Sequence, residues 1–560
     1  MTTRKMFSRR EFIRGVGAGA LAGSAIVRSA SAVAAPGSLF QHGVASGDPL
    51  PDRVIIWTRV SAGRPGAVAV LWEVALDAAF TRIIRRGRVL TGPMADYTVK
   101  ADVLGLPSNA RLHYRFRAEG QLSPVGRTRT LPTGAVEQVK LVVLSCSNYP
   151  AGYFNVYAEA ARVDDVFAAV HLGDYIYEYS RAGYASGDAA ALGRLSEPEN
   201  EILTLNDYRA RHAQYRTDAD LQAMHAAMPV IAVWDDHEVA NDTWRDGAEN
   251  HTEGVEGEFA DRRAAAIRAY HEWMPTRLPD PARPDRIYRS FRFGNLLSLH
   301  MLDTRVIGRD QQLDFANYFG AAGFDGARFA ADLADPNRTL LGAEQNDWLG
   351  LQLAKSDTVW DVLGQQVLMG RMNVPAPLVL GQIGFSAYAA LAFKAQTAPA
   401  TLTPAEALLI SQPAIPYNLD AWDGYAVARE RVLGAARALD RNLVVLSGDT
   451  HNAWASDLTD FSGHRIGVEF ATPSVSSPGL EGFFTTEDPL AVAAGLTQII
   501  GPLQYADTAR RGFMIVTASA TDCRAEWRYV STVKSRTYAV ANGPALRMLP
   551  GAANRRIVPG

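Results

Sequence analysis

The stretch Val166–Tyr177 reads VFAAVHLGDYIY, a short apolar run that ends in an acidic and aromatic motif. Four other segments repeat the pattern of an apolar run followed by polar or charged side chains: KLVVLSCSN (140–148), PVIAVWDDHE (229–238), LLSLHMLDTR (296–305) and NLVVLSGDTH (442–451). Short apolar runs of this kind are typical of strands buried on both faces, and helical segments lie between them. The sequence therefore predicts βαβ units and an α/β fold in which the polar strand ends converge.

The composition limits the kind of protein and its partners. The chain has 560 residues, of which 48% are apolar and 21% charged, as in ordinary globular proteins. This length is enough for two to four domains of about 100–200 residues each. The net charge of −3 provides no basic field, so neither nucleic acid nor an anionic membrane surface is expected as a partner.

Residues 1–34 have the pattern of an export signal. A charged segment containing Arg9 and Arg10 precedes a Gly- and Ala-rich apolar stretch over 15–27, and small residues follow over 30–34. The paired arginines resemble a twin-arginine signal, which exports folded proteins. The apolar stretch is too short to span about 30 Å of hydrocarbon. We therefore expect the twin-arginine machinery as a partner, removal of the leader, and a periplasmic or secreted protein without stable membrane insertion.

Two regions of different pattern follow the leader. Residues 36–133 contain short β-rich runs separated by turn signals, which predicts a small all-β sandwich of the fibronectin-III type. Residues 138–535 contain the strand-end motifs and form the expected catalytic domain. Within it, the Ala- and Leu-rich segment 374–438 is expected to form a helical lid or a surface insertion. Residues 536–560 are expected to form a C-terminal tail.

The strand-end motifs resemble those of a known family. Gly173–Tyr177 is similar to the GDxxY element of calcineurin-like and purple acid metallophosphoesterases, while Asp235–Glu238 and Gly448–His451 resemble variants of their GNHD/E and GHxH elements. In combination with Ser145–Ser147 and the leader, these motifs resemble the alkaline phosphatase D (PhoD-like) family over nearly all of the mature chain. The resemblance implies a metallophosphoesterase-type β-sandwich flanked by helices and an enzyme that hydrolyses phosphate esters.

Four residues form the expected first metal site. The thiolate of Cys146 and the phenolate of Tyr177 suit a redox-capable metal such as Fe³⁺ better than Mg²⁺ or Ca²⁺. Asp174 and His451 complete the expected ligand set. This set uses the ends of three different predicted strands.

A second metal site is expected beside the first. By family analogy Asp174 bridges the two sites, and Asp236 and Asp449 stand where the family has Asn and His. Carboxylates in place of nitrogen donors favour Ca²⁺ over Zn²⁺, and the resemblance implies the same pair, Fe³⁺ with Ca²⁺. Asp235 and Asn241 are further candidate ligands, because a carboxylate and an amide close to Asp236 in the sequence could complete a shell of oxygen donors. The sequence has no obvious counterpart of the VxxH ligand of the purple enzymes.

The expected reaction is hydrolysis of a phosphate-ester substrate by a metal-bound hydroxide, which needs no serine nucleophile. By resemblance to GNHD/E, His237 is the catalytic residue that hydrogen-bonds the phosphate or protonates the leaving oxygen. The alternative is that His237 is a ligand, or a structural imidazole held by Glu238. Asn148 and Asn452 are candidate donors to the phosphate, with turn formation as the alternative.

Two sets of alternatives remain open at this point. A disulfide between Cys146 and Cys523 would consume the proposed thiolate ligand, whereas Cys523 is otherwise structural. A phospholipase-D-like phosphodiesterase would use the same metal site as a phosphatase or phosphodiesterase. A catalytically silent exported binding protein would need a broken ligand set, and no ligand of the set is broken.

Overall fold

The computed structural model describes residues 27–28, 37–63, 65–321, 323–482 and 487–560. The predicted leader lies outside this part of the chain, apart from β1 (Val27–Arg28), which pairs with β26 (Thr537–Tyr538). Within the described residues, no helix has the length and apolar character needed to span a bilayer.

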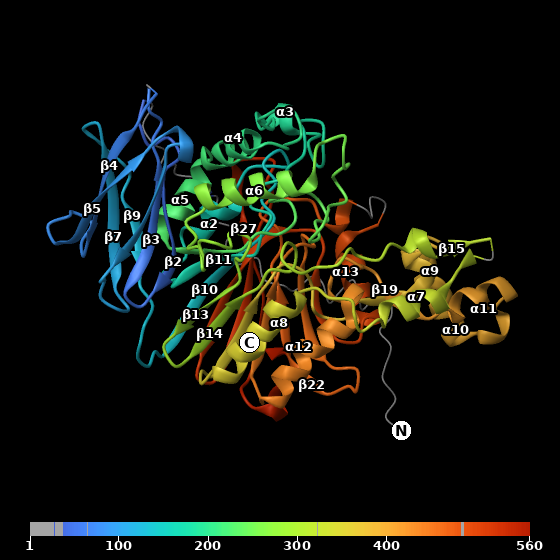
Figure 1. Ribbon diagram of the computed structural model, residues 1–560. Helices are drawn as coiled ribbons and strands as arrows, with labels where there is room; N and C mark the ends of the chain where they lie inside the picture. The colour runs from blue at the N-terminus through green and yellow to red at the C-terminus, as the bar shows by residue number, and fades with distance from the viewer. Residues whose placement is uncertain (1–26, 29–36, 64, 322, 483–486) are drawn as a thin grey trace.

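Two large mixed sheets form the body of the molecule, with helices on their outer faces (Figure 1). In the described residues the first sheet has ten strands in the order β28-β27-β25-β24-β10-β11-β12-β2-β3-β6. In chain order these strands are β2 (Val44–Leu50), β3 (Arg53–Arg59), β6 (Thr98–Leu104), β10 (Gln138–Leu144), β11 (Ala168–His171), β12 (Val230–Ala232), β24 (Arg511–Ser519), β25 (Cys523–Val530), β27 (Val540–Met548) and β28 (Val558–Pro559).

The second sheet has seven strands among the described residues, in the order β13-β14-β17-β20-β22-β21-β23. In chain order they are β13 (Arg289–Phe293), β14 (Leu297–Met301), β17 (Trp360–Gly364), β20 (Leu443–Ser447), β21 (Ala453–Thr459), β22 (Arg465–Ala471) and β23 (Leu503–Asp507). The inner strands of both sheets run parallel: β10, β11 and β12 in the first, and β14, β17 and β20 in the second.

Strand β20 shows why the apolar runs of the sequence form buried strands. Its side chains alternate between two cores, because successive residues of a strand point to opposite faces. Val444 and Leu446 belong to the core between the two sheets, while Leu443 and Val445 face the helices on the outside. The α/β fold of two sheets flanked by helices, expected from the sequence, is therefore confirmed.

Helices cover both outer faces of the two sheets (Figure 1). The first sheet is covered by α2 (Asn155–Ala160), α4 (Leu205–Arg216), α5 (Ala219–Ala227) and α6 (Phe259–Trp273), and the second by α8 (Gly342–Lys355), α12 (Ala426–Ala438) and α13 (Pro489–Ile499). The short α3 (Ala189–Leu192) lies in the long connection between α2 and α4.

The N-terminal all-β region shares a sheet with the rest of the chain. A sheet that has five strands in the described residues packs against β2, β3 and β6 around a common apolar core. Its strands are β4 (Val68–Ala75), β5 (Ile83–Thr91), β7 (Arg111–Ala118), β8 (Gln121–Leu122) and β9 (Gly126–Arg129). Strand β2 also pairs with β12 through Gly47 and Val230, so one layer of the N-terminal sandwich continues the catalytic sheet.

The C-terminal residues form strands, where the sequence predicted a tail. Strand β27 pairs with β25 from Cys523 opposite Met548 to Val530 opposite Val540, and β28 pairs with β27 at the edge of the sheet. Because β27 is only partly buried, it lacks the apolar alternation that marks a strand in a sequence.

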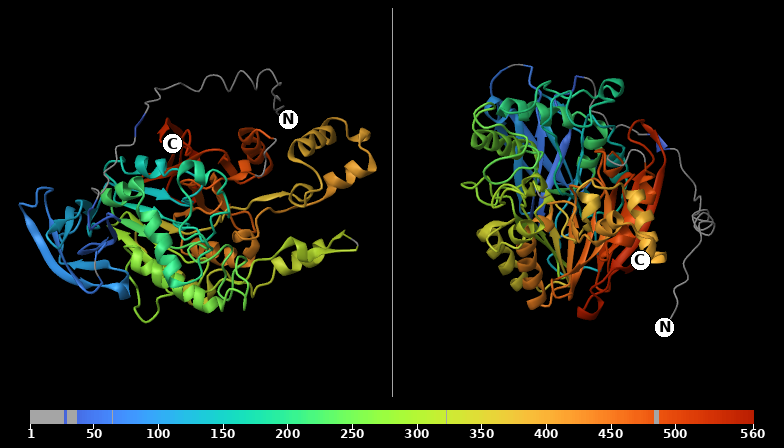
Figure 2. Two further views of the ribbon diagram at one scale, coloured as in Figure 1. Left: turned by 90° about the horizontal axis from the view of Figure 1, so that it is seen from above. Right: turned by 90° about the vertical axis from the view of Figure 1, so that its right-hand side faces the viewer.

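The segment 374–438 divides into two parts. Strands β18 (Asn373–Pro375) and β19 (Ala414–Pro416) pair with each other and connect a helical projection to the body of the molecule (Figure 2). The helices of the projection are α9 (Ala376–Val379), α10 (Phe385–Thr397) and α11 (Pro404–Ser411). Phe329 of α7 (Gly326–Leu333) packs with Ile415 of β19. Helix α12 is not part of the projection, because its Val432 and Leu433 pack in the core with β20.

Replacing Gly47 by alanine is expected to weaken the junction between the N-terminal sandwich and the catalytic sheet. A Cβ atom at this position would lie 2.4 Å from the carbonyl oxygen of Pro275 and 2.6 Å from that of Val230, and backbone atoms cannot rotate away. We expect Gly47→Ala to lower the free energy of unfolding by about 1–3 kcal/mol, measured by urea denaturation. Gly63→Ala, where a Cβ meets open space, is the control; equal stability of the two variants would contradict the prediction.

Candidate active site

The polar strand ends of both sheets converge on one cavity. Loops after β10, β11 and β12 carry Cys146, Asp174 and Asp236, and the loop after β20 carries Asp449 and His451. Parallel strands present their carboxyl ends at one edge of a sheet, and the loops from this edge of both sheets bring their side chains together. Residues separated by more than 300 positions in the sequence are therefore neighbours in space.

The loops that carry these side chains have unusual backbone conformations. Cys146, Asp174, Asp449 and His451 all have positive φ angles, of 62°, 56°, 63° and 64°. A non-glycine residue in this region costs on the order of 1 kcal/mol or more and persists only where the surroundings fix it. Four of the positive-φ residues of the described chain are thus candidate metal ligands on the strand-end loops.

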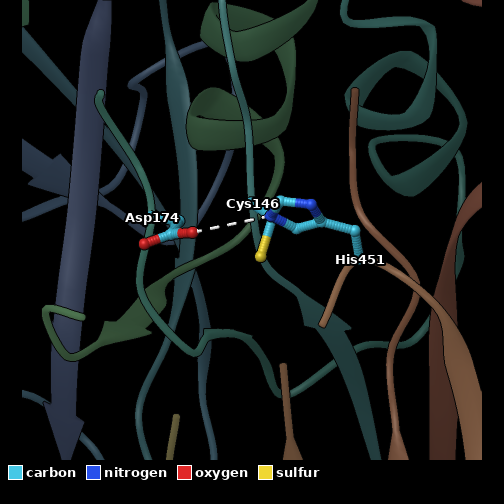
Figure 3. Close-up of side chains that lie close together, drawn as sticks. All are labelled: Cys146, Asp174 and His451. Atoms are coloured by element: carbon cyan, nitrogen blue, oxygen red, sulfur yellow. Dashed lines mark ion pairs between the residues drawn. The ribbon is translucent and has the colours of Figure 1, made fainter. Parts of the chain in front are cut away.

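Cys146, Asp174 and His451 form the first of three clusters of candidate metal ligands found in the described part of the chain (Figure 3). Their ligand atoms lie within 4.8 Å of one another, and His451 Nε2 is 3.9 Å from Asp174 Oδ2. The hydroxyl of Tyr177 donates to Asp174 Oδ2 at 2.8 Å and lies 3.2 Å from His451 Nε2. Sulfur, phenol, carboxylate and imidazole thus surround one point.

The other two clusters share Asp236. Asp174, Asp236 and His237 form one of them, and Asp235, Asp236 and Asp449 form the other. Although burial opposes ionisation, the charges of Arg305 and His237 hold the pKa of Asp236 below its ordinary value. Asp236 is therefore a charged oxygen donor between two groups of potential ligands.

The electrostatics of the clusters call for added positive charge. Burial, followed by the charge of Asp174, raises the pKa of Cys146 well above its ordinary value, and burial raises those of Asp174 and Asp449 as well. Asp174 Oδ1 is buried without a hydrogen-bond partner in the described part of the chain. A metal ion would supply the missing partner and favour the ionised forms, so the donor set fits metal ions.

His451 has the protonation state that a metal ligand requires. Burial lowers its pKa to about 3, so the imidazole is neutral at neutral pH. The carbonyl of Pro478 lies 2.7 Å from Nδ1 and accepts the proton of that nitrogen. This contact leaves Nε2, which faces Tyr177 and Asp174, with a free electron pair.

His237 is held by Glu178, not by Glu238. Its Nδ1 lies 2.7 Å from the fully buried Glu178 carboxylate, and its ring lies over that of Tyr177 with centroids 4.1 Å apart. Burial lowers the pKa of His237, but the carboxylates of Asp236 and Glu178 outweigh it and raise this pKa well above the ordinary value. The ring is therefore protonated at neutral pH and fixed in orientation.

Glu238 instead joins two of the site loops. Its buried carboxylate accepts the backbone N–H groups of Asp174 at 3.0 Å and Asp235 at 2.6 Å, together with those of Tyr175 and Ile176. Burial nevertheless raises the pKa of Glu238 to about 7. One side chain thus fixes the loops after β11 and β12 relative to each other.

Arg305, from the loop after β14, lies among the carboxylates with no exposed surface. Its Nε is 2.5 Å from Asp235 and its Nη2 is 3.1 Å from Asp449, while Nη1 lies 2.6 Å from Asp420. Asp235 Oδ1 therefore already has a positively charged partner, the guanidinium of Arg305. Burial raises the pKa of Asp235 to about 7.

The three candidate asparagines make other contacts. Asn241 lines the cavity, but its amide donates to Glu249 at 3.1 Å. Asn148 donates to the carbonyl of Tyr184, and Asn452 donates to the carbonyl of Thr450 and accepts from Leu480 N–H. The contacts of Asn148 and Asn452 are of the kind expected for loop formation. Neither of them lines the cavity.

Both cysteines are free and buried. Cys146 Sγ lies 3.0 Å from the hydroxyl of Ser145, and Cys523 pairs through its backbone with Ala518 and Met548 in the first sheet. The structure therefore contains no Cys146–Cys523 disulfide, which was the alternative to a thiolate ligand.

Sequence reasoning missed three acidic groups and the position of one basic group. Glu178 holds His237, Asp242 lines the cavity, and Asp420 binds Arg305. Burial, with Asp420 and Asp236 nearby, raises the pKa of Asp242 to about 7. Glu178 directly follows Tyr177, and Arg305 is the last residue of the strand-end segment 296–305; these positions were the available signal.

Comparisons with known proteins agree with this site. A family model described as PhoD-like phosphatase matches residues 141–527, and one described as PhoD-like phosphatase, N-terminal domain, matches residues 25–132. Alkaline phosphatase D of Bacillus subtilis (strain 168) is 40% identical over 500 residues, which cover 84% of this chain and 77% of that protein. A solved structure described as that of PhoD has a TM-score of 0.75 at 35% identity and covers 93% of this chain and 92% of its own.

The fold and these relatives define the class of the protein, a phosphoric ester hydrolase. The chain belongs to the PhoD-like phosphatase family. The resemblance carried by the strand-end motifs is thus confirmed, as is the enzyme class that it implied.

Replacing Glu238 by glutamine tests its role as the junction of the site loops. The amide keeps the shape of the carboxylate but turns one acceptor into a donor that faces backbone N–H groups, leaving buried donors unpaired. We expect Glu238→Gln to lower the free energy of unfolding by about 1–3 kcal/mol, measured by urea denaturation. The exposed Glu137→Gln serves as the control. A Glu238→Gln protein as stable as that control would show that the junction contributes nothing.

Proposed function

We propose that this protein is an exported, metal-dependent phosphatase and phosphodiesterase that uses Fe³⁺ and Ca²⁺. The observation that carries the proposal is the cluster of buried acidic and soft donors at the converging strand ends, with an unpartnered oxygen of Asp174 at its centre. The family membership supports the hydrolysis of phosphate esters.

The donor types support the choice of metals. The proposed Fe³⁺ ligands are Cys146, Asp174, Tyr177 and His451; the proposed Ca²⁺ ligands are Asp174, Asp236 and Asp449, with Asp235 and Asn241 as further candidates. Thiolate and phenolate favour a redox-capable transition metal, and a set of oxygen donors favours Ca²⁺. The contacts of Asp235 with Arg305 and of Asn241 with Glu249 argue for supporting roles of these two residues.

The chain's own residues account for the remaining steps. Bound cations would supply the positive charge that holds the phosphate oxygens and activates water. His237 lines the cavity, and its Nδ1 contact with Glu178 leaves Nε2 available. Because its pKa is raised, Nε2 carries a proton that it donates to a phosphate oxygen or to the leaving oxygen. Contact with the ring of Tyr177 and the bond to Glu178 fix the orientation of the imidazole for this transfer.

The metals and the role of His237 are tested by elemental analysis and kinetics on the same preparations. We expect active protein to contain iron and calcium, and Asp174→Asn to lose metal and turnover together because a shared ligand charge is removed. His237→Ala is expected to keep its metals while its kcat for bis-p-nitrophenyl phosphate falls about 10²–10⁴-fold.

Wild-type protein prepared in parallel is the reference, and removal of metal by a chelator should abolish turnover. Stoichiometric zinc without iron in active protein would overturn the choice of metals. Near-native metal content and turnover in Asp174→Asn would overturn the site itself.

Export by the twin-arginine route is proposed from the leader pattern around Arg9 and Arg10. We expect the double substitution Arg9→Lys with Arg10→Lys to keep the precursor in the cytoplasmic fraction, because the paired arginines are the receptor-read signal. Arg14→Lys is the charge-matched control, and N-terminal sequencing of the exported protein should begin within residues 32–35. Export of the double-lysine variant at the wild-type level would contradict the route.

A further inference from the structure

The sheet formed by β4, β5, β7, β8 and β9 in the N-terminal sandwich has two different faces. One face packs against β2, β3 and β6, and the other is directed away from the body of the molecule (Figure 1). Val70 and Phe116 belong to the sandwich core. Because successive residues of a strand point to opposite faces, the neighbouring Leu71 and Arg117 lie on the outward face.

Arginine and leucine alternate in a row across this outward face. Leu71 of β4 lies opposite Arg88 of β5 and opposite Arg117 of β7, and Arg117 lies opposite Leu122 of β8. Residues directly opposite each other in paired strands share a face. All four side chains are exposed, with exposed fractions of 47% for Leu71 and 51% for Leu122. A single exposed leucine is ordinary, but this row combines leucines with cations on one surface.

The adjacent rows extend the same combination of side chains. Leu90 of β5, which is 65% exposed, lies two residues beyond Arg88 on the same face. Arg86 lies on the other side of the row, and Arg127 of β9 lies further in that direction, opposite His113. The surface formed by the following seven residues is called the basic face below: Leu71, Arg86, Arg88, Leu90, Arg117, Leu122 and Arg127.

The positive charge of the basic face is not neutralised by neighbouring acidic groups. At the outward positions of these strands, as far as the structure describes them, the acidic residue is Glu73, and it binds Arg115 at 2.8 Å. No ion pair within the described part of the chain involves the four arginines of the basic face. The net charge of −3, from which no anionic membrane partner is expected, averages over the whole chain and conceals this local excess of positive charge.

The chemistry of the basic face fits the surface of an anionic lipid bilayer better than a soluble polyanion. Arginine binds phosphate oxygens through paired N–H groups, and each cation near an anionic bilayer strengthens binding on the order of fivefold. Exposed leucines stabilise a complex only where they leave water. The boundary between lipid headgroups and acyl chains accepts apolar side chains, whereas a hydrated polyanion does not.

We propose that the basic face docks this protein on a bilayer that contains anionic lipid. The arginines lie at the lipid phosphates, and Leu71 and Leu90 reach the boundary with the acyl chains. The N-terminal sandwich is then a module for peripheral membrane binding, without insertion of a helix. Since the acidic clusters lie on loops of other strands, this inference is independent of the proposed function.

Vesicle sedimentation with the full chain tests the inference. Wild-type protein is expected to bind vesicles made of equal parts of phosphatidylglycerol and phosphatidylcholine, and to bind vesicles of phosphatidylcholine alone on the order of a hundredfold more weakly. Added salt should weaken the binding, because it screens exposed charges. Equal binding to both kinds of vesicle, or binding to neither, would overturn the inference.

Charge-matched variants connect this binding to the basic face. The triple variant Arg86→Gln, Arg88→Gln and Arg117→Gln is expected to raise the Kd for anionic vesicles on the order of a hundredfold, at about fivefold per arginine. The control removes the same charge at three exposed arginines outside the sandwich, through Arg431→Gln, Arg465→Gln and Arg556→Gln. Equal Kd values for the two triple variants, with unchanged thermal unfolding, would contradict the role of the basic face.

Leucine variants separate a lipid surface from a soluble polyanion. Leu71→Ser with Leu90→Ser is expected to weaken binding to anionic vesicles about tenfold and to leave binding to soluble polyglutamate unchanged. Leu351→Ser with Leu408→Ser, at positions 57% and 66% exposed outside the sandwich, is the matched control. Polyglutamate binding as tight as vesicle binding, with no effect of the Leu71 and Leu90 substitutions, would replace the lipid partner by a soluble polyanion.

Hydrogen exchange on wild-type protein locates the contact and decides the inference even if a variant fails to fold. Strand β5 forms the edge of its sheet, so it has amide groups that exchange readily until they are covered. Anionic vesicles are expected to slow exchange in peptides that cover β5 and β7. Protection confined to residues 1–34, or to the loops of the acidic clusters, would show that the bilayer binds elsewhere and would overturn the inference.

Discussion

Mutual repulsion among buried carboxylates is the constraint on which the rest of this structure depends. Asp174, Asp235, Asp236 and Asp449 lie close together in a region shielded from water, where uncompensated negative charge is strongly unfavourable. Arg305 neutralises one side of the group. The other side, around the unpartnered oxygen of Asp174, is where the proposed cations offset the charge. Bound cations would therefore also stabilise the folded protein.

Rigid loops keep these like charges in position. Positive φ angles at Cys146, Asp174, Asp449 and His451 are sustained because strands of both sheets fix the loop ends. The carboxylate of Glu238 binds backbone groups of two loops at once. Since metal ligands must keep their geometry as the bound charge changes, such supporting contacts are as necessary as the ligands.

The cavity is lined by two different kinds of segment. The acidic clusters follow the ends of buried strands, whereas Leu378, Val379 and Ile383 of the lining come from the projecting segment (Figure 2) and Leu496 comes from α13. Loops and insertions tolerate change in sequence more readily than core strands. The lining from the projecting segment can therefore change in sequence while the acidic clusters stay the same.

The sequence by itself determined the buried strands and the polar motifs at their ends, because an apolar run followed by Asp174 or Asp449 is a local pattern. It did not reveal the strands over 540–559, whose edge position leaves no apolar alternation. Only the tertiary structure decided that Glu178 holds His237, that Arg305 lies between Asp235 and Asp449, and that the segment after β18 lines the cavity. These are long-range pairings, and the partner of a buried charge depends on which strand ends the sheets bring together.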